Sequence, residues 1–231
     1  MVADTLYKYV VPERIDVLVN KRIRFTQPCF LNDPFEFKPG FPVPAADGIV
    51  HFEAKAKARD VHFRELSRLY GVLCLTTKKD SIPMWTHYAA AHEGFVIGFD
   101  TKSEFIANAI SGGELSPVTY QPERPSLTGK YPTLIFLTKS TEWVSEEEWR
   151  WVKCCRSPSE YDEVLPSSSG ELLYLCRFQP SSVREIILGC RANSTLKKSI
   201  QALTLTSEYR HVSLSRMALD EHHYQLQIES L

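Results

Sequence analysis

The segment from Glu146 to Trp151 combines acidic, basic and aromatic side chains at a spacing that suits chemistry, since it reads Glu-Glu-Glu-Trp-Arg-Trp. Side chains alternate between the two faces of a strand, so Glu146, Glu148 and Arg150 are expected on one face and the tryptophans on a buried one. Repulsion between the carboxylates can raise one pKa, while the guanidinium lowers it. The pattern predicts a polar site. The alternative is an edge strand with solvated ion pairs, which contribute little to stability.

A second candidate segment, Phe30–Glu36, reads Phe-Leu-Asn-Asp-Pro-Phe-Glu. Asn and Asp side chains before a proline favour a tight turn in which they bond their own backbone. Asn32 and Asp33 therefore either stabilise a turn or line a site beneath a loop.

A third candidate segment, Met84–Tyr88, reads Met-Trp-Thr-His-Tyr. On a helix, Trp85 and Tyr88 lie three positions apart and share a face, while His87 points away from Trp85. This aromatic face either stacks on a planar ligand ring or packs in the core, with His87 bonded to backbone.

Several well-known site motifs do not occur in the sequence. It has no zinc-type Cys/His spacing and no H-E-x-x-H, and His87 and His92 are five residues apart, on different helix faces. G-x-S-x-G, the phosphate-binding P-loop and G-x-G-x-x-G are also missing. We therefore expect no metal, and no hydrolase elbow or Rossmann-type cofactor site.

Length and composition predict one folded domain over residues 1–231. The chain is 43% hydrophobic and 24% charged, which is typical of globular proteins. A chain of this length buries on the order of 70% of its unfolded surface. Its 27 basic and 28 acidic residues give a net charge of -1, so no global basic field favours nucleic acid, although a local patch is compatible with this charge.

The expected location is cytoplasmic, without a membrane partner. No apolar run reaches the roughly 18 residues of a membrane span. Residues 1–5 do not begin a secretory signal. The six cysteines form no C-x-x-C pair, so we expect mostly buried or inert thiols, with the neighbours Cys154 and Cys155 as the pair of most interest.

Strands and helices alternate without a regular βαβ rhythm, which predicts an α+β fold with a split, largely antiparallel sheet and flanking helices. Strands are expected near residues 6–11, 22–26, 72–77, 95–99, 133–137, 147–155, 172–178, 186–188, 211–215 and 224–228. Helices are expected from residue 12, over 50–70, 81–91 and 101–110, from residue 180, and over 193–203.

Taken in order, the motifs resemble a widespread, mostly microbial family known as a domain of unknown function. They are Leu6–Tyr9, Phe30–Glu36, Met84–Tyr88 with Gly94 and Phe99–Asp100, and Lys139–Arg150 (Lys-Ser-x-x-Trp-x-x-Glu-x-Glu-Trp-Arg). The resemblance runs from Tyr7 to Trp151, about two-thirds of the chain. The layout of that family is in turn similar to that of ADP-ribosyltransferases, which hold NAD in the cleft of a split antiparallel sheet. Some ADP-ribosyltransferases modify DNA.

The resemblance implies roles for particular residues. Glu148 would be the catalytic carboxylate and Glu146 the first member of a Glu-x-Glu pair. Lys8 would meet the diphosphate of NAD. Thr76 or Thr77 would lie on the ribose side, and Trp85 or Tyr88 beside the nicotinamide. The remaining residues expected at the dinucleotide site are Tyr7, Asn32, Asp33, His87 and Arg150.

The chemistry implied is cleavage of NAD between ribose and nicotinamide. Positive charge develops on the sugar ring, so a carboxylate that faces it binds the transition state better than the ground state. The acceptor of ADP-ribose would be a macromolecule, protein or nucleic acid, or water. Two alternatives are a non-catalytic module that binds a nucleotide or a protein in the same cleft, and a nucleic-acid-modifying protein with Lys21, Arg22 and Arg24 on phosphates.

Overall fold

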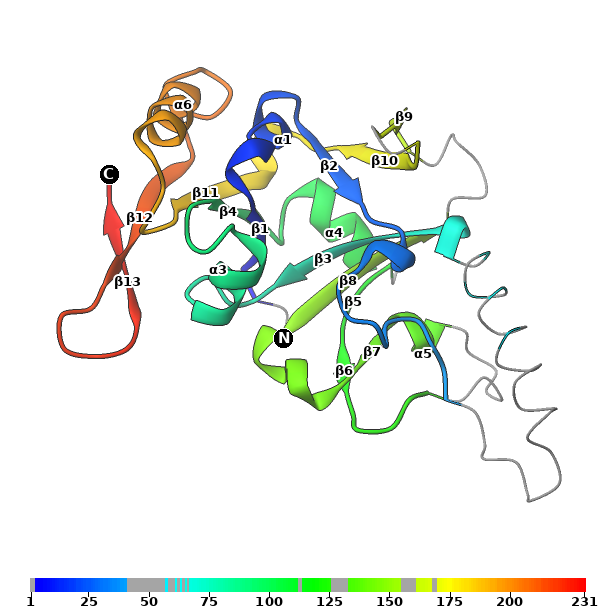
Figure 1. The fold of residues 1–231 in the computed structure, drawn as a ribbon. Coiled ribbons are helices and arrows are strands. Elements are labelled where there is room, and N and C mark those ends of the chain that lie inside the picture. The colour runs from blue at the N-terminus through cyan, green and yellow to red at the C-terminus, as the bar shows by residue number, and fades with distance from the viewer. Residues whose placement is uncertain are drawn as a thin grey trace, which may run out of the picture.

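A sheet of eight strands organises the molecule (Figure 1). The computed structural model describes residues 3–40, 57, 61, 63, 65, 67–111, 114–125, 133–154, 161–167 and 170–231. From edge to edge the strands are β13 (Leu226–Ser230), β12 (Ser213–Leu219), β11 (Val183–Leu188), β4 (Phe95–Asp100), β1 (Thr5–Val10), β3 (Tyr70–Thr76), β8 (Glu148–Cys154) and β5 (Leu115–Pro117). All neighbours pair antiparallel except β11 and β12, so the expected α+β class with a largely antiparallel sheet is confirmed.

Two smaller sheets and several short helices complete the described structure. The sheets are β2 (Arg22–Phe25) with β10 (Leu172–Arg177) and β9 (Glu163–Pro166), and the parallel pair β6 (Thr119–Tyr120) and β7 (Thr138–Lys139). The α-helices are α1 (Asp16–Val19), α3 (Ile82–Tyr88), α4 (Glu104–Ser111), α5 (Thr133–Phe136) and α6 (Ser194–Thr204). The 3-10 helices are η1 (Pro12–Arg14), η2 (Pro28–Phe30), η3 (Thr141–Glu146) and η5 (Pro180–Ser182).

The central strands are buried because apolar clusters pack on both faces of the sheet. In β1, Leu6 and Val10 join the largest cluster, whereas Tyr7 and Tyr9 join a second one. The neighbouring β4 is apolar and buried from Phe95 to Phe99, and only its last residue, Asp100, is charged and partly exposed. Near-continuous hydrophobic strands of this kind are what a strand covered on both sides requires.

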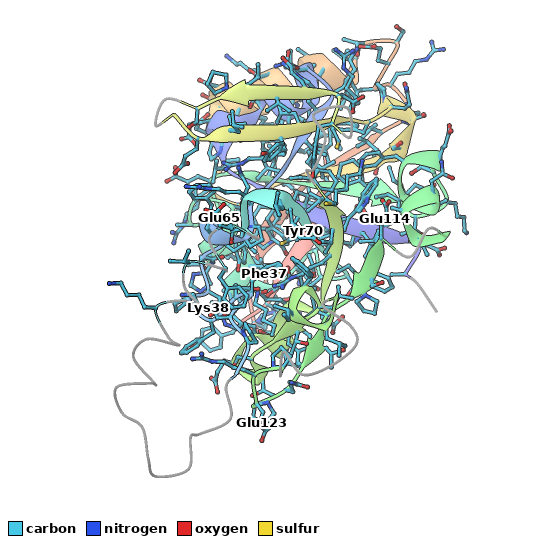
Figure 2. The ribbon with its side chains drawn as sticks, turned by 90° about the vertical axis from the view of Figure 1, so that its right-hand side faces the viewer. Phe37, Lys38, Glu65, Tyr70, Glu114 and Glu123 are labelled. Carbon is cyan, nitrogen blue, oxygen red and sulfur yellow. The ribbon has the colours of Figure 1, made fainter. Side chains whose placement is uncertain are left out.

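A third apolar cluster fixes the loop that carries Glu36. The ring of Phe37 packs edge-on against Phe136, with 4.8 Å between the ring centroids, and Phe136 also contacts Tyr70. Figure 2 shows Phe37 and Tyr70 close together in the middle of the view. This anchor holds the preceding residue, Glu36, within hydrogen-bond distance of Arg150 in β8.

Most expected elements are present, with two corrections. The stretch 133–137 is not a strand: residues 133–136 form α5, because a short apolar run does not distinguish a buried strand from a buried helical turn. The helix expected over 81–91 ends at Tyr88, and Ala90, Ala91 and His92 all adopt positive φ. The helix expected over 50–70 lies largely outside the described residues, of which 57, 61, 63, 65 and 67–69 are helical.

The described helices and thiols add two general facts. No described helix is long and apolar enough to cross a membrane. Five cysteines are free thiols, namely Cys29, Cys74, Cys154, Cys176 and Cys190, while Cys155 lies outside the described residues.

Candidate functional site

A cleft opens where β1 and β3 separate. β1 pairs with β4 along six residues but with β3 only at Tyr7 and Thr76. Further along, β3 is bridged instead by Thr26, which pairs with Val72. In the gap, Lys8 Nζ donates a hydrogen bond of 3.1 Å to the carbonyl oxygen of Cys74. The sheet is thus split at this point, and a lysine side chain lies in the opening.

The cleft has a volume of about 350 Å³ and gathers residues that are far apart in the sequence. Eight of the twelve residues predicted for the site line it: Tyr7, Lys8, Asn32, Thr76, His87, Tyr88, Glu146 and Glu148. They come from β1, the loop after η2, β3, α3, the end of η3 and the start of β8. The structure therefore places Lys8 and the two glutamates in one cleft.

The two glutamates reach the cleft by a turn and not by strand alternation. Ser140 caps η3 by accepting a hydrogen bond from Glu142 N, and η3 ends at Glu146. Glu147 then adopts a left-handed conformation with φ of 44°, and β8 begins at Glu148. The expectation that Glu146, Glu148 and Arg150 share one strand face is wrong for Glu146, because this left-handed residue separates it from the strand.

Arg150 lies behind Glu148 and holds its carboxylate. Arg150 is 0% exposed. Its Nε and Nη2 donate to the two carboxylate oxygens of Glu148 at 2.8 and 2.9 Å. Nη2 also donates to Glu36 Oε1 at 2.6 Å, and Nη1 to the carbonyl oxygen of Phe136 at 3.0 Å. The guanidinium therefore makes four hydrogen bonds inside the protein, and Arg150 is not among the residues that line the cleft.

Lys139 joins the two glutamates. Its Nζ donates to Glu146 Oε2 at 2.5 Å and to Glu148 Oε2 at 3.0 Å, and lies 3.7 Å from Glu36 Oε1. Lys139 is buried, and β7 fixes it by pairing with β6, where Tyr120 is its partner. The hydroxyl of Tyr120 in turn accepts a hydrogen bond of 2.8 Å from Glu148 N. Three carboxylates and two cations thus form one buried cluster.

The cluster keeps Glu148 ionised. Burial by itself raises the pKa of Glu148, but the neighbouring Arg150 and Lys139 outweigh it and lower the pKa to about 2. Burial also works against the charged form of Lys139, yet Glu148 and Glu146 raise its pKa above the usual range. At Glu36, burial is the dominant effect and raises the pKa of the carboxyl group.

Tyr88 connects Glu146 to the outer part of the cleft. The tyrosine hydroxyl donates to Glu146 Oε1 at 2.7 Å and accepts a hydrogen bond of 3.2 Å from Asn32 Nδ2. Burial and the Glu146 carboxylate both raise the pKa of Tyr88, so its hydroxyl stays protonated and remains a donor. The backbone of Glu146 is held as well, since Thr76 Oγ1 donates a hydrogen bond of 2.5 Å to its carbonyl oxygen.

Four predicted site residues are not at the cleft. Trp85 is 0% exposed and packs in the second cluster, where its ring lies edge-on to Tyr9 and its Nε1 donates to the Lys79 carbonyl oxygen. Asp33 stabilises a turn, since its Oδ1 accepts from Phe35 N at 2.8 Å. The third is Thr77, which bonds Glu147 at the surface, and the fourth is Arg150, buried behind Glu148. At Trp85 and Asp33, the packing and turn alternatives are the ones observed.

Sequence reasoning missed Lys139 and Glu36 as site residues. Both lie inside segments that the sequence had singled out, at the start of Lys139–Arg150 and the end of Phe30–Glu36. An unpaired buried charge is costly, so a buried Glu-x-Glu pair requires cations nearby, and this requirement could have pointed to Lys139. Among the described residues, no group of three or more His, Cys, Asp or Glu side chains could hold a metal ion.

The low pKa of Glu148 predicts a pH dependence of stability. A carboxyl group whose pKa is lower in the folded state than in the unfolded state stabilises the fold at a pH above its unfolded-state pKa. This stabilisation is lost as the pH falls toward the pKa of the folded state. For Glu148 the window runs from 4.5 down to about 2. As the pH falls through this window, we expect the free energy of unfolding to decrease more for wild type than for Glu148→Gln, because the variant has no carboxylate at position 148 to titrate. Urea titrations at about pH 5 and about pH 3 measure the difference. Equal losses in the two proteins would contradict the low pKa.

Residues 84–151 match the model of a family described as a protein of unknown function (DUF2971). This stretch includes α3 from Met84 onward, Lys139 and the two site glutamates, whereas Lys8 and Glu36 precede it. The comparison with curated proteins found no match, and neither did the comparison with solved structures. The resemblance to a family of unknown function is thereby supported, and the further resemblance to ADP-ribosyltransferases stays a prediction.

Proposed function

We propose that this protein is an ADP-ribosyltransferase-like enzyme that cleaves NAD and transfers ADP-ribose to a macromolecular acceptor or to water. The observation that carries the proposal is the split between β1 and β3, where Lys8 and an ionised Glu148 line the same cleft. An ammonium group suits the phosphates of a dinucleotide, and a fixed carboxylate suits the charge that develops on its ribose.

In the proposed reaction, the bond between the ribose C1′ and the nicotinamide nitrogen breaks, and its electron pair leaves with nicotinamide. The oxygen or nitrogen of the acceptor forms the new bond to C1′ and loses a proton. Glu148 faces the positive charge of the sugar ring. Because Arg150 and Lys139 fix this carboxylate in advance, it needs no reorganisation when the charge appears.

The charge of the cluster fits this role. Two cations alone would neutralise Glu148 and Glu146, but Glu36 adds a third carboxylate beside Arg150 and Lys139. With all five groups ionised, the cluster keeps one net negative charge. Because the cluster is buried, such a charge acts more strongly on a nearby cationic transition state than it would in bulk solvent.

The direct test is release of nicotinamide from NAD by purified wild type, measured alone and with protein or nucleic-acid acceptors. Release with water alone supports glycohydrolase activity, and release that needs an acceptor supports transfer. If wild type releases no nicotinamide under any of these conditions, the enzymatic proposal fails, and the cleft is better explained as the site of a non-catalytic nucleotide-binding module.

Glu146 is proposed to act on the acceptor. Its Oε1 accepts from Tyr88 and its Oε2 from Lys139, so it is oriented toward the cleft as a candidate general base. We expect Glu146→Gln to lower transfer to an acceptor by about 10²-fold or more while hydrolysis of NAD falls less. Parallel assays of labelled acceptor and released nicotinamide separate the two effects. An equal fall in both would assign Glu146 to NAD cleavage itself.

A further inference from the structure

Arg24 is a half-buried cation that forms no ion pair with any carboxylate of the described residues. In β2, Ile23 and Phe25 face the core, so Arg22 and Arg24 lie on the opposite face. The Nε of Arg24 is buried and has no hydrogen-bond partner. Within the described part of the chain, Arg24 forms no ion pair, whereas Arg22 pairs with Glu163. The Nη groups of Arg24 are not buried and have no hydrogen-bond partner among the described residues, so they are the atoms that an external anion can reach.

The surroundings of Arg24 add positive charge. Burial lowers the pKa of Arg24, and nearby Arg14 lowers it further, while Glu171 offsets part of this effect. Arg14 itself is bonded to Asp16 at 2.8 Å. The protein therefore places a second arginine near Arg24, and no carboxylate of the described residues forms an ion pair with Arg24. An anion bound at the Nη groups of Arg24 would offset this repulsion.

Arg24 lies at the rim of the cleft. Its Cζ atom is 5.9 Å from the centroid of the Phe30 ring, and Phe30 lines the cleft. Thr26, two residues further along the same strand face, also lines it. Phe30 is 40% exposed, so an accessible aromatic residue and a cation lie side by side at this end of the cleft.

The size of the cleft requires a large ligand to extend beyond it. Its volume of about 350 Å³ is near the lower end of the roughly 300–1,000 Å³ typical of small-molecule pockets. A nucleoside at Glu148 would fill most of this space. The second half of a dinucleotide would then extend beyond the cleft, and Phe30 and Arg24 offer it a surface at one end.

We propose that Arg24 and Phe30 form a rim subsite for a nucleoside diphosphate, with Arg24 on a phosphate and Phe30 stacked on the base. A guanidinium offers paired donors that match phosphate oxygens, and an aromatic ring stacks on any base. In identifying the occupant as the ADP half of NAD, the inference rests on the proposed function. Binding of a free nucleoside diphosphate does not require that function.

The test is calorimetric titration of the intact protein with ADP and with adenosine. Arg24→Gln should weaken ADP binding by at least about tenfold, the effect of one lost charge-assisted hydrogen bond. Adenosine binding should not change, because it has no phosphate. Arg22→Gln is the matched control: it removes the same charge from the same strand face, but Arg22 already has Glu163 as its partner. Thermal melting of each variant shows that it is folded.

The outcomes separate this inference from the proposed function. ADP binding that depends on Arg24 but not on Arg22 supports the subsite, whether or not NAD is cleaved. No ADP binding by wild type, equal losses in both variants, or wild-type affinity in Arg24→Gln would overturn it. Nicotinamide release by wild type together with any of these three results would leave the proposed function standing and reject the subsite alone.

Discussion

Glu148→Gln is expected to lower the rate of nicotinamide release from NAD by about 10²–10³-fold, the usual effect of losing one preorganised electrostatic group. Glutamine has nearly the same size and shape as glutamate, but it brings no negative charge to the cationic ribose. Steady-state release of nicotinamide at saturating NAD measures the effect. Undiminished release by this variant would rule out Glu148 as the catalytic carboxylate.

Loss of activity in this variant must be separated from loss of structure. The glutamine amide would direct N–H groups at Arg150 or Lys139, which are themselves donors, so some destabilisation is expected. Glu148→Asp keeps the charge and should retain more activity. Glu147→Gln is the control, because its side chain bonds Thr77 and Lys78 at the surface. It should release nicotinamide at the wild-type rate.

Arg150→Met is expected to lower the free energy of unfolding by about 3–5 kcal/mol, because removing one partner of a buried ion pair leaves the other charges uncompensated. Both oxygens of Glu148 and one of Glu36 lose a donor, and both carboxylates are buried. Urea denaturation followed by fluorescence or circular dichroism measures the change.

The control for this prediction is Arg216→Met. Arg216 also pairs with a glutamate, Glu229, at 2.6 Å, but the two side chains are 51% and 48% exposed. Exposed pairs contribute about 0–1 kcal/mol, so this variant should be nearly as stable as wild type. Adding Glu148→Gln to Arg150→Met should cost less than the sum of the single changes, because the two residues are in contact. Similar small effects of the two arginine variants would show that the buried cluster does not stabilise the fold.

The local pattern of the sequence determined most secondary structure and the class of the fold. Buried strands such as β3 and β4 were recognisable because a strand covered on both faces must be apolar along its length. The helix α6 begins directly after Asn193, whose side chain caps it. Where the local signal was ambiguous, as in the short apolar run of α5, the prediction was wrong, since packing decides between strand and helix there.

The site was predicted in part, because residue types can be read from the sequence but spatial neighbours cannot. The sequence pointed to Lys8, Tyr88, Glu146 and Glu148, which do line one cleft. It left open whether Trp85, in the same segment as Tyr88, stacks on a ligand or packs in the core, and in the structure Trp85 is buried. One helix presents the two rings to different surroundings, and only the packing of α3 against β1 decides which ring reaches the cleft.

Only the tertiary structure decided how the charges are compensated. The sequence placed Arg150 beside Glu148, but Glu36 lies 114 residues from Arg150, and a two-residue strand positions Lys139. Ion pairs between distant segments leave no periodic pattern, because they need only the right distance after folding. The alternation of side chains along a strand likewise does not predict the left-handed conformation of Glu147. The sequence thus determined which groups are available, and the fold determined that five of them share one buried cluster at the split of the sheet.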